Sequence, residues 1–289
     1  MLYTIENDYL KASISSTGAE LVELIDKDGI NRLHTPSEDT WNNTSPNLFP
    51  MVSSFKDNVY YFEGNRYLMP RHGFLRNSTY YPESVEKTKV VFHIMHNEYT
   101  LKVFPFMFHL FITFELKDNK LIVSYKVLNV SKTKMYFLLG GHPALKVPLY
   151  ENERYGDYSL KFPYRETANT LTLNSNNNIC EKEENYLLNQ NEIALSYKVF
   201  DDRDTIMLKD LKSKYVDLVS RSNPKVTRVH FDDFKILAIW CKNKPNMDYI
   251  CIEPWNIQDN FTVNIEEMGV PTLEPLESRV YSYTIEVLN

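Results

Sequence analysis

The sequence predicts an all-β protein built as a large antiparallel β-sandwich. Segments in which apolar and polar side chains alternate recur from one end of the chain to the other, as is typical of half-buried strands. The 289 residues include 20 Tyr and 16 Phe but only 8 Gly, a composition that favours pleated strands. Neither a long helical periodicity nor an alternation of strand and helix patterns is visible, which argues against a doubly wound parallel fold.

The expected strands follow one another along the chain with turn signals between them. Tyr9–Ser15 begins the series, and residues 60–68 read as a hairpin with Gly64 in its turn. The clearest hairpin joins 108–116 to 121–130 through an Asp-Asn turn, because both residues tolerate left-handed backbone angles. The remaining expected strands are 89–95, 205–208, 215–220, 236–241, 249–253 and 280–287.

A polar stretch interrupts this series in the second half of the chain. Asn174–Asn178 is of low complexity, and Glu181–Asn191 is rich in polar residues. Because strand patterns continue on both sides, we expect a surface excursion here and not a linker. With no internal repeat and no shift in composition, residues 1–289 are expected to form a single domain.

Charge and cysteine content exclude several classes of protein. The net charge of −6 argues against an extended nucleic-acid or anionic-membrane surface. Three Cys without CxxC spacing do not make a disulfide framework. The N-terminus shows no secretory signal, and the most apolar run, Val103–Phe114, is shorter than the ~20 residues of a membrane span. We therefore expect a cytoplasmic protein with neither nucleic acid nor membrane as partner.

The common metal and nucleotide motifs are absent from the sequence. There is no HExxH or Cys/His cluster, no GxGxxG, no GxxxxGK[ST] and no GxSxG. His93 and His96 lie three apart in a strand pattern, so we expect them on opposite faces, in structural roles. No cofactor and no metal is predicted.

One candidate site segment is Ile250-Cys251-Ile252-Glu253-Pro254-Trp255. Strand alternation places Cys251 and Glu253 on the same face. Pro254 lacks an N–H and is expected to end the strand or put it at a sheet edge. Glu253 then lies beside a Trp, where burial would raise its pKa toward that of a general base. The alternative is a rim carboxylate paired with Lys or Arg.

Two histidine segments are the other candidates. In Gly140-Gly141-His142-Pro143, the glycines let another group approach the backbone closely, and Pro143 restricts His142 to an extended conformation. An imidazole held in this way can hold or give a proton near neutral pH. His72, flanked by two arginines and followed by a glycine, is a candidate on similar grounds, and an ordinary turn or loop histidine is the alternative in both cases.

The ordered set of these segments resembles the aldose 1-epimerase (galactose mutarotase) superfamily, and in particular its LacX-like branch. The resemblance covers nearly the whole chain and includes an early GAEL segment. Its most specific part is the succession of HGF, GGHPA and EPW, at residues 72–74, 140–144 and 253–255. It implies the galactose mutarotase-like sandwich fold and a sugar as the small-molecule partner.

The resemblance also implies roles for individual residues. Glu253 corresponds to the general base on the anomeric hydroxyl, and His142 to the general acid on the ring oxygen. His72 corresponds to a second histidine that holds the sugar, and Asp204 to a residue that binds sugar hydroxyls. We expect these side chains to converge on one cleft, with His142 and Glu253 far enough apart to flank a pyranose ring.

One position departs from the pattern of the branch. Ser54 stands where an arginine of the substrate pocket is expected, so a five-donor cation is replaced by a small hydroxyl. One alternative is that Lys56, Arg71 or Arg76 supplies the positive charge of the missing arginine. The others are that the substrate preference has changed or that the activity is weak.

Three functions follow as alternatives. The first is a mutarotase that interconverts the α and β anomers of a free hexose. The second is the same chemistry on a phosphorylated hexose, with Lys56, Arg71 and Arg76 serving the phosphate. The third is a sugar-binding or sensing protein that has lost catalysis. The sequence leaves the oligomeric state open between a monomer and a homodimer.

Overall fold

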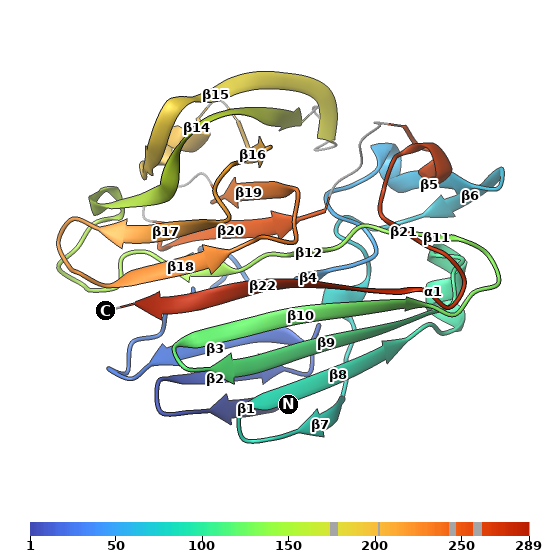
Figure 1. The fold of residues 1–289 in the computed structure, drawn as a ribbon, viewed down its shortest axis with the longest axis horizontal. Coiled ribbons are helices and arrows are strands. Elements are labelled where there is room, and N and C mark those ends of the chain that lie inside the picture. Colours follow the sequence, from blue (N-terminus) through green and yellow to red (C-terminus); the bar gives the residue numbers. More distant parts are fainter. Residues whose placement is uncertain (174–178, 202, 243–246, 257–261, 289) are drawn as a thin grey trace.

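The computed structural model describes residues 1–173, 179–201, 203–242, 247–256 and 262–288. Within this part of the chain the fold is a large antiparallel β-sandwich, as the sequence predicts (Figure 1). Every pair of named strands is antiparallel. The predicted low-complexity patch Asn174–Asn178 lies outside the described residues.

The main sheet brings together strands from most of the chain. Its order is β4-β12-β20-β19-β16-β14-β17-β18-β22-β10-β9-β8-β7, with β13 paired to β20 and β15 to β14. The bounds are β4 (Asn47–Leu48), β7 (Pro82–Val85), β8 (Lys89–Met95), β9 (Phe108–Lys117), β10 (Lys120–Asn129), β12 (Gly140–Gly141), β13 (Ala144–Lys146), β14 (Tyr158–Leu173), β15 (Ile179–Ala194), β16 (Thr205–Lys209), β17 (Tyr215–Ser220), β18 (Val226–His230), β19 (Ile236–Trp240), β20 (Tyr249–Trp255) and β22 (Ser278–Leu288).

Smaller elements cover parts of this sheet. A three-stranded sheet packs on the β8–β10 region, where Tyr3 meets Phe92 edge-on with 5.8 Å between the ring centroids. Its strands are β1 (Leu2–Glu6), β2 (Leu10–Ser15) and β3 (Glu20–Asp26). Two ribbons pair β5 (Val59–Phe62) with β6 (Asn65–Leu68) and β11 (Met135–Tyr136) with β21 (Thr272–Leu273). The helices are α1 (Glu98–Val103), η1 (Lys56–Asn58), η2 (Leu75–Asn77), η3 (Tyr155–Asp157), η4 (Tyr197–Phe200) and η5 (Ile265–Glu267). None of the described helices is long and apolar enough to cross a membrane.

The predicted hairpin of β9 and β10 is confirmed and shows how sequence alternation builds the core. Along β9 every second side chain is buried, from Phe108 to Leu116, and β10 alternates in the same way. The turn closes with Lys117 opposite Lys120, and Asp118 takes a φ of 51°. Because β22 pairs along the other edge of β10, the hairpin lies inside the main sheet.

The polar surface excursion expected at residues 181–191 is a strand and not a loop. These residues belong to β15, which forms a long hairpin with β14, a strand that the sequence patterns also missed. β15 pairs only with β14, and several register shifts interrupt the ladder. Many of its side chains are therefore exposed, so this strand carries polar residues without the alternation that predicted the others.

Pro254 does not end its strand, which contradicts a second expectation. β20 continues to Trp255 and is paired on both sides, with β19 on one and with β12 and β13 on the other. On the second side the N–H groups of Ile252 and Asn256 donate to the carbonyls of Pro143 and Leu139. Pro254 lies between these two donors. At this position the chain around His142 interrupts the pairing with β12 and β13, so no N–H is needed there.

Gly73 fixes how the loop of His72 joins the sheet. Its φ is +76°, and a Cβ atom there would lie 2.0 Å from the carbonyl oxygen of Phe49. The two residues form an isolated bridge, and the N–H of Phe74 donates to the same oxygen at 3.1 Å. Only glycine combines this backbone angle with such a close approach.

We therefore expect Gly73→Ala to lower the free energy of unfolding by about 1–3 kcal/mol through backbone strain, and by more through the overlap with Phe49. Gly29→Ala is the matched control, because Gly29 has a φ of +79° and a Cβ atom there would meet no heavy atom within 4 Å. Chemical denaturation of both variants measures the difference. Equal destabilisation would show that the close approach to Phe49 costs nothing.

Candidate active site

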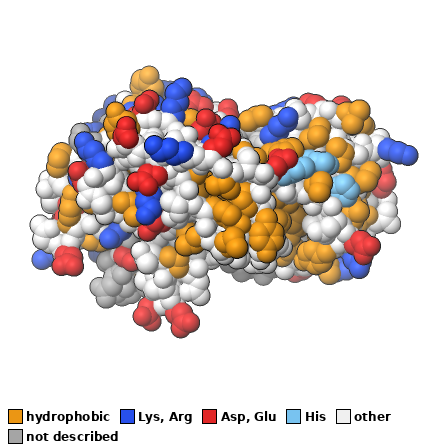
Figure 2. All heavy atoms as spheres, turned by 90° about the horizontal axis from the view of Figure 1, so that it is seen from below, with side chains coloured by type: hydrophobic (Ala, Val, Ile, Leu, Met, Phe, Trp, Pro, Cys, Tyr) orange, Lys and Arg blue, Asp and Glu red, His pale blue; other side chains and the backbone are white. Residues whose placement is uncertain are grey.

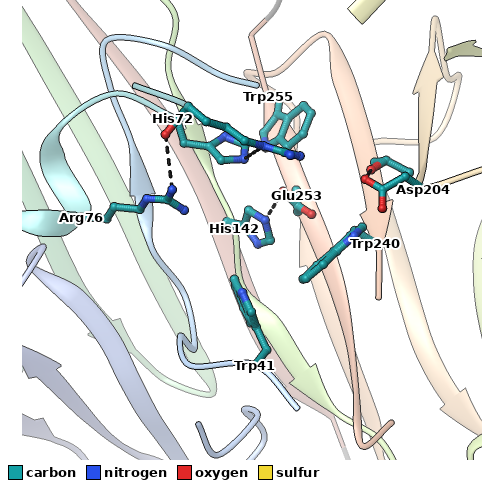
Figure 3. A pocket seen from close by; sticks show the side chains of 10 residues that line it. Trp41, His72, Arg76, His142, Asp204, Trp240, Glu253 and Trp255 are labelled. Atoms are coloured by element: carbon teal, nitrogen blue, oxygen red, sulfur yellow. Dashed lines mark hydrogen bonds and ion pairs between the residues drawn. The ribbon is translucent and has the colours of Figure 1, made fainter. Parts of the chain in front are cut away.

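One pocket of about 280 Å³ collects four of the five predicted site residues (Figure 3). This volume is near the lower end of small-molecule sites. His72, His142, Asp204 and Glu253 line it, whereas Ser54 is buried and is not part of the lining. The other residues of the lining are Trp41, Arg71, Arg76, Thr205, Trp240 and Trp255.

Adjacent strands of the main sheet position the two proposed catalytic side chains. Glu253 lies in β20, and His142 lies between β12 and β13, which both pair with β20. At Gly140 a Cβ would come within 2.5 Å of the Trp255 ring, so the glycine lets this ring lie against the backbone next to His142. The pairing of β20 with these short strands therefore brings a histidine and a glutamate from distant segments to the same place.

His142 and Glu253 touch each other. Nε2 of His142 lies 3.0 Å from Oε2 of Glu253, and the two side chains are 8% and 1% exposed. The approach lacks hydrogen-bond geometry, because both oxygens of Glu253 and Nδ1 of His142 have no hydrogen-bond partner among the described residues. The expectation that the two groups stand far enough apart to flank a pyranose ring is therefore wrong in this structure.

Burial dominates the electrostatics of Glu253. Removal from water raises the pKa of its carboxyl group above the ordinary value, and His142 and Arg71 oppose this shift. A buried carboxylate with free lone pairs costs free energy unless a donor reaches it. A hydrogen-bond donor that reached Glu253 would therefore lower this cost.

His72 is held as a neutral imidazole. Burial, followed by the charges of His142, Arg71 and Arg76, lowers its pKa well below the ordinary value. The N–H of Ser53 donates to its Nδ1 at 3.1 Å. The Nε–H of Arg71 points at its Nε2 at 3.3 Å. A neutral imidazole has only one acceptor nitrogen, so His72 satisfies one of these two donors at a time.

All three tryptophans of the chain line the pocket. The Trp41 ring lies 4.9 Å from that of His142 and 5.3 Å from that of Trp240, and Trp255 lies 5.9 Å from His72. Aromatic rings of this kind suit the apolar face of a sugar. Sequence reasoning missed Trp41, although a Trp in the polar stretch 37–43 was a usable signal.

Glu20, from the GAEL segment, anchors the loop that carries Trp41. Its Oε1 accepts the N–H groups of Thr44 and Ser45 at 2.6 and 2.9 Å, and the Thr44 carbonyl accepts from Ala144, next to the His142 segment. Burial raises the pKa of the Glu20 carboxyl group. The sequence signalled this residue only through the resemblance, because its partners lie more than twenty residues away.

Two arginines bring positive charge to the pocket in place of the arginine expected at position 54. Arg71 and Arg76 line the pocket, and no ion pair with a carboxylate is found for either among the described residues. Burial and Arg71 lower the pKa of the Arg76 guanidinium. Lys56, the third cation considered as a replacement, is exposed and outside the lining.

Asp204 lies at the rim of the pocket. It is exposed and immediately precedes β16, whose first residue, Thr205, pairs with Trp240 in β19. In Figure 3 its carboxylate faces the pocket from the side opposite His72 and Arg76. The sheet therefore presents this side chain across the opening from the two histidines.

Other histidines gather away from the pocket. Figure 2 shows histidine side chains together at the surface on the side of β7 and β8. Nε2 of His93 lies 2.8 Å from Nδ1 of His109, and His96 lies 6.4 Å from His109 between ring centroids. β8 ends at Met95, so strand alternation does not extend to His96, and both histidines neighbour His109.

Comparison with known proteins agrees with this fold and pocket. The sequence profile of the aldose 1-epimerase family matches residues 1–267. The chain belongs to the aldose 1-epimerase family. Within it, the chromosomal LacX protein of Lactococcus lactis subsp. lactis is 31% identical over 307 residues, covering 100% of both chains.

Solved structures of this family are similar along the whole chain. A galactose mutarotase related enzyme from Lactobacillus acidophilus is 27% identical with a TM-score of 0.92, covering 100% of this chain and 98% of that one. A galactose mutarotase-like protein from Lactobacillus casei is 26% identical with a TM-score of 0.87, covering 100% of both. The resemblance to the LacX-like branch is confirmed.

Proposed function

We propose that this aldose 1-epimerase family member is a mutarotase that interconverts the α and β anomers of a free hexose such as galactose or glucose. The observation that carries the proposal is the buried contact of His142 with Glu253 in a pocket walled by tryptophans. Family membership supports a sugar as the substrate, and the pocket volume suits a single ring.

The proposed reaction begins when the sugar enters between the two groups. Its anomeric hydroxyl donates to Glu253, whose oxygens lack hydrogen-bond partners among the described residues, and its ring oxygen faces His142. Both sugar oxygens are bonded to the same carbon, so the groups that serve them need to part by only a short distance. The hydroxyl thus gives Glu253 a hydrogen bond that the contact with His142 does not provide.

Proton transfers then open and close the ring. Glu253 takes the proton of the anomeric hydroxyl while His142 gives one to the ring oxygen, and the ring opens to the free aldehyde. Rotation about the C1–C2 bond and the reverse transfers close the ring as the other anomer. The contact with His142 favours the ionised form of Glu253, which is the form a base requires.

The remaining lining residues hold the sugar in this proposal. Arg71 and His72 lie together in the lining and offer donors to sugar oxygens, and Asp204 accepts hydroxyl protons at the rim. Trp41 and Trp240 pack on the ring. Ser54 has no direct part, because it is outside the lining.

Replacing the base tests the assignment. We expect Glu253→Gln to slow catalysed anomer exchange by about 10²–10⁴-fold. At neutral pH its melting temperature should equal or exceed that of the wild type, because burial raises the pKa of Glu253 and the ionised carboxylate is costly there. Polarimetry and thermal unfolding measure the two effects.

Glu166→Gln is the matched control for this variant. Glu166 is also 1% exposed, but it binds the backbone of Lys212 and Ser213 outside the pocket. The Glu166→Gln variant should unfold at a lower temperature than the wild type and exchange anomers at the same rate. An unchanged rate in Glu253→Gln would contradict the mechanism, and saturable sugar binding without exchange in the wild type would favour a sugar-sensing protein.

A phosphorylated hexose is the second candidate substrate, and the two pocket arginines favour it. If the phosphate binds there, Arg76→Gln should lower kcat/KM for a hexose 6-phosphate by roughly 10- to 100-fold relative to the free hexose, because hydrogen bonds to charged groups contribute about 1.5–3 kcal/mol. Lys56→Gln, an exposed cation outside the lining, is the control. Equal effects of Arg76→Gln on both sugars would exclude phosphate from this position.

A further inference from the structure

A buried thiol lies directly behind the proposed catalytic pair. Cys251 is two residues before Glu253 in β20, so strand alternation puts both on one face. The ligand-type atoms of Cys251, His142 and Glu253 all lie within 4.8 Å of one another. Cys251 itself is 0% exposed, and it is not among the residues that line the pocket.

We propose that these three residues form an inhibitory site for a thiophilic divalent cation, with Zn²⁺ as the probe. Zinc binds sulfur at about 2.3 Å and nitrogen or oxygen at about 2.0–2.2 Å, so its ligand atoms stand roughly 3–4 Å apart. The three atoms, which lie within 4.8 Å of one another, need to move only slightly closer to reach these distances. Because His142 and Glu253 line the pocket, water from it would complete a tetrahedral site.

The unpartnered atoms of the site point to a cation. Both Glu253 oxygens are buried without a hydrogen-bond partner among the described residues. When zinc binds, the Cys251 thiol gives its proton to solvent, and the resulting thiolate and the Glu253 carboxylate together balance the double positive charge. A thiolate and an imidazole select zinc-like metals over Mg²⁺ or Ca²⁺, which prefer oxygen ligands.

The ion enters through the pocket, because His142 and Glu253 line it and the thiol of Cys251 lies within 4.8 Å of both. The inhibition rests on the proposed function, since the metal would occupy both groups that move protons, and the sugar would then compete with it. The binding itself does not depend on any sugar chemistry. No sequence motif signals this site, because two of its ligands come from β20 and the third from the break between β12 and β13.

Two titrations with the full chain test the proposal. Co²⁺ should produce a thiolate-to-metal charge-transfer band, and Zn²⁺ should abolish it and inhibit anomer exchange competitively with the sugar. In Cys251→Ala the band should vanish and the inhibition constant should rise at least about 100-fold, because even indirect partners of a metal site contribute 10–100-fold. Basal exchange should persist, since Cys251 takes no part in the reaction.

Cys241→Ala is the matched control, because Cys241 is also buried but lies outside the three-residue group. It should keep the band and the zinc sensitivity. Cys251→Ser serves in place of the alanine variant if that variant is unstable, with the same expected loss of the band. Absence of the band in the wild type, or equal zinc sensitivity of the Cys251 variants, would overturn the proposal. A band in a protein that exchanges no anomers would leave the metal site standing and refute the mutarotase instead.

Discussion

The pairing of β20 with β12 and β13 is the constraint on which the rest of the structure depends. It places Glu253 in a strand that is paired on both sides and His142 at the break between two short strands, so that the side chains meet at 3.0 Å. Pro254 supports the break because it has no N–H to pair at that position. A carboxylate placed there is costly to the fold, which is common where a side chain is kept for function.

The loops around this pair are held by backbone contacts that leave little freedom. Gly73 lies against the carbonyl of Phe49 and orients His72, whose Nδ1 receives the N–H of Ser53. Glu20 holds the loop of Trp41 through two further N–H groups. The site is therefore preorganised by the sandwich, and the sugar meets donors and acceptors whose directions are already set.

The fold could be predicted from the sequence where alternation is strong. The hairpin of β9 and β10 shows a clear period of two, because one face of each strand is buried. The sequence did not predict β15 because this strand pairs with β14 and exposes many of its side chains. Alternation reports burial on one face, so a strand without such a face gives no signal.

The candidate site could be predicted where a short motif marks it. His72, His142 and Glu253 stand in recognisable segments, and they line one pocket with Asp204. Ser54 was included by correspondence with a family position, but its side chain lies outside the lining. The place of Trp41 in the pocket and the closeness of Cys251 to His142 depend on contacts between distant segments, which no local pattern encodes.

The most direct test of the acid–base pair is the pH dependence of kcat/KM for anomer exchange. Glu253 must be ionised to accept a proton, and burial raises its pKa above the ordinary carboxyl value of 4.5. The rate should therefore fall as the pH decreases, with an apparent pKa for this loss clearly above 4.5. A rate that stays constant down to pH 4.5 would contradict the assignment of the buried Glu253 as the base.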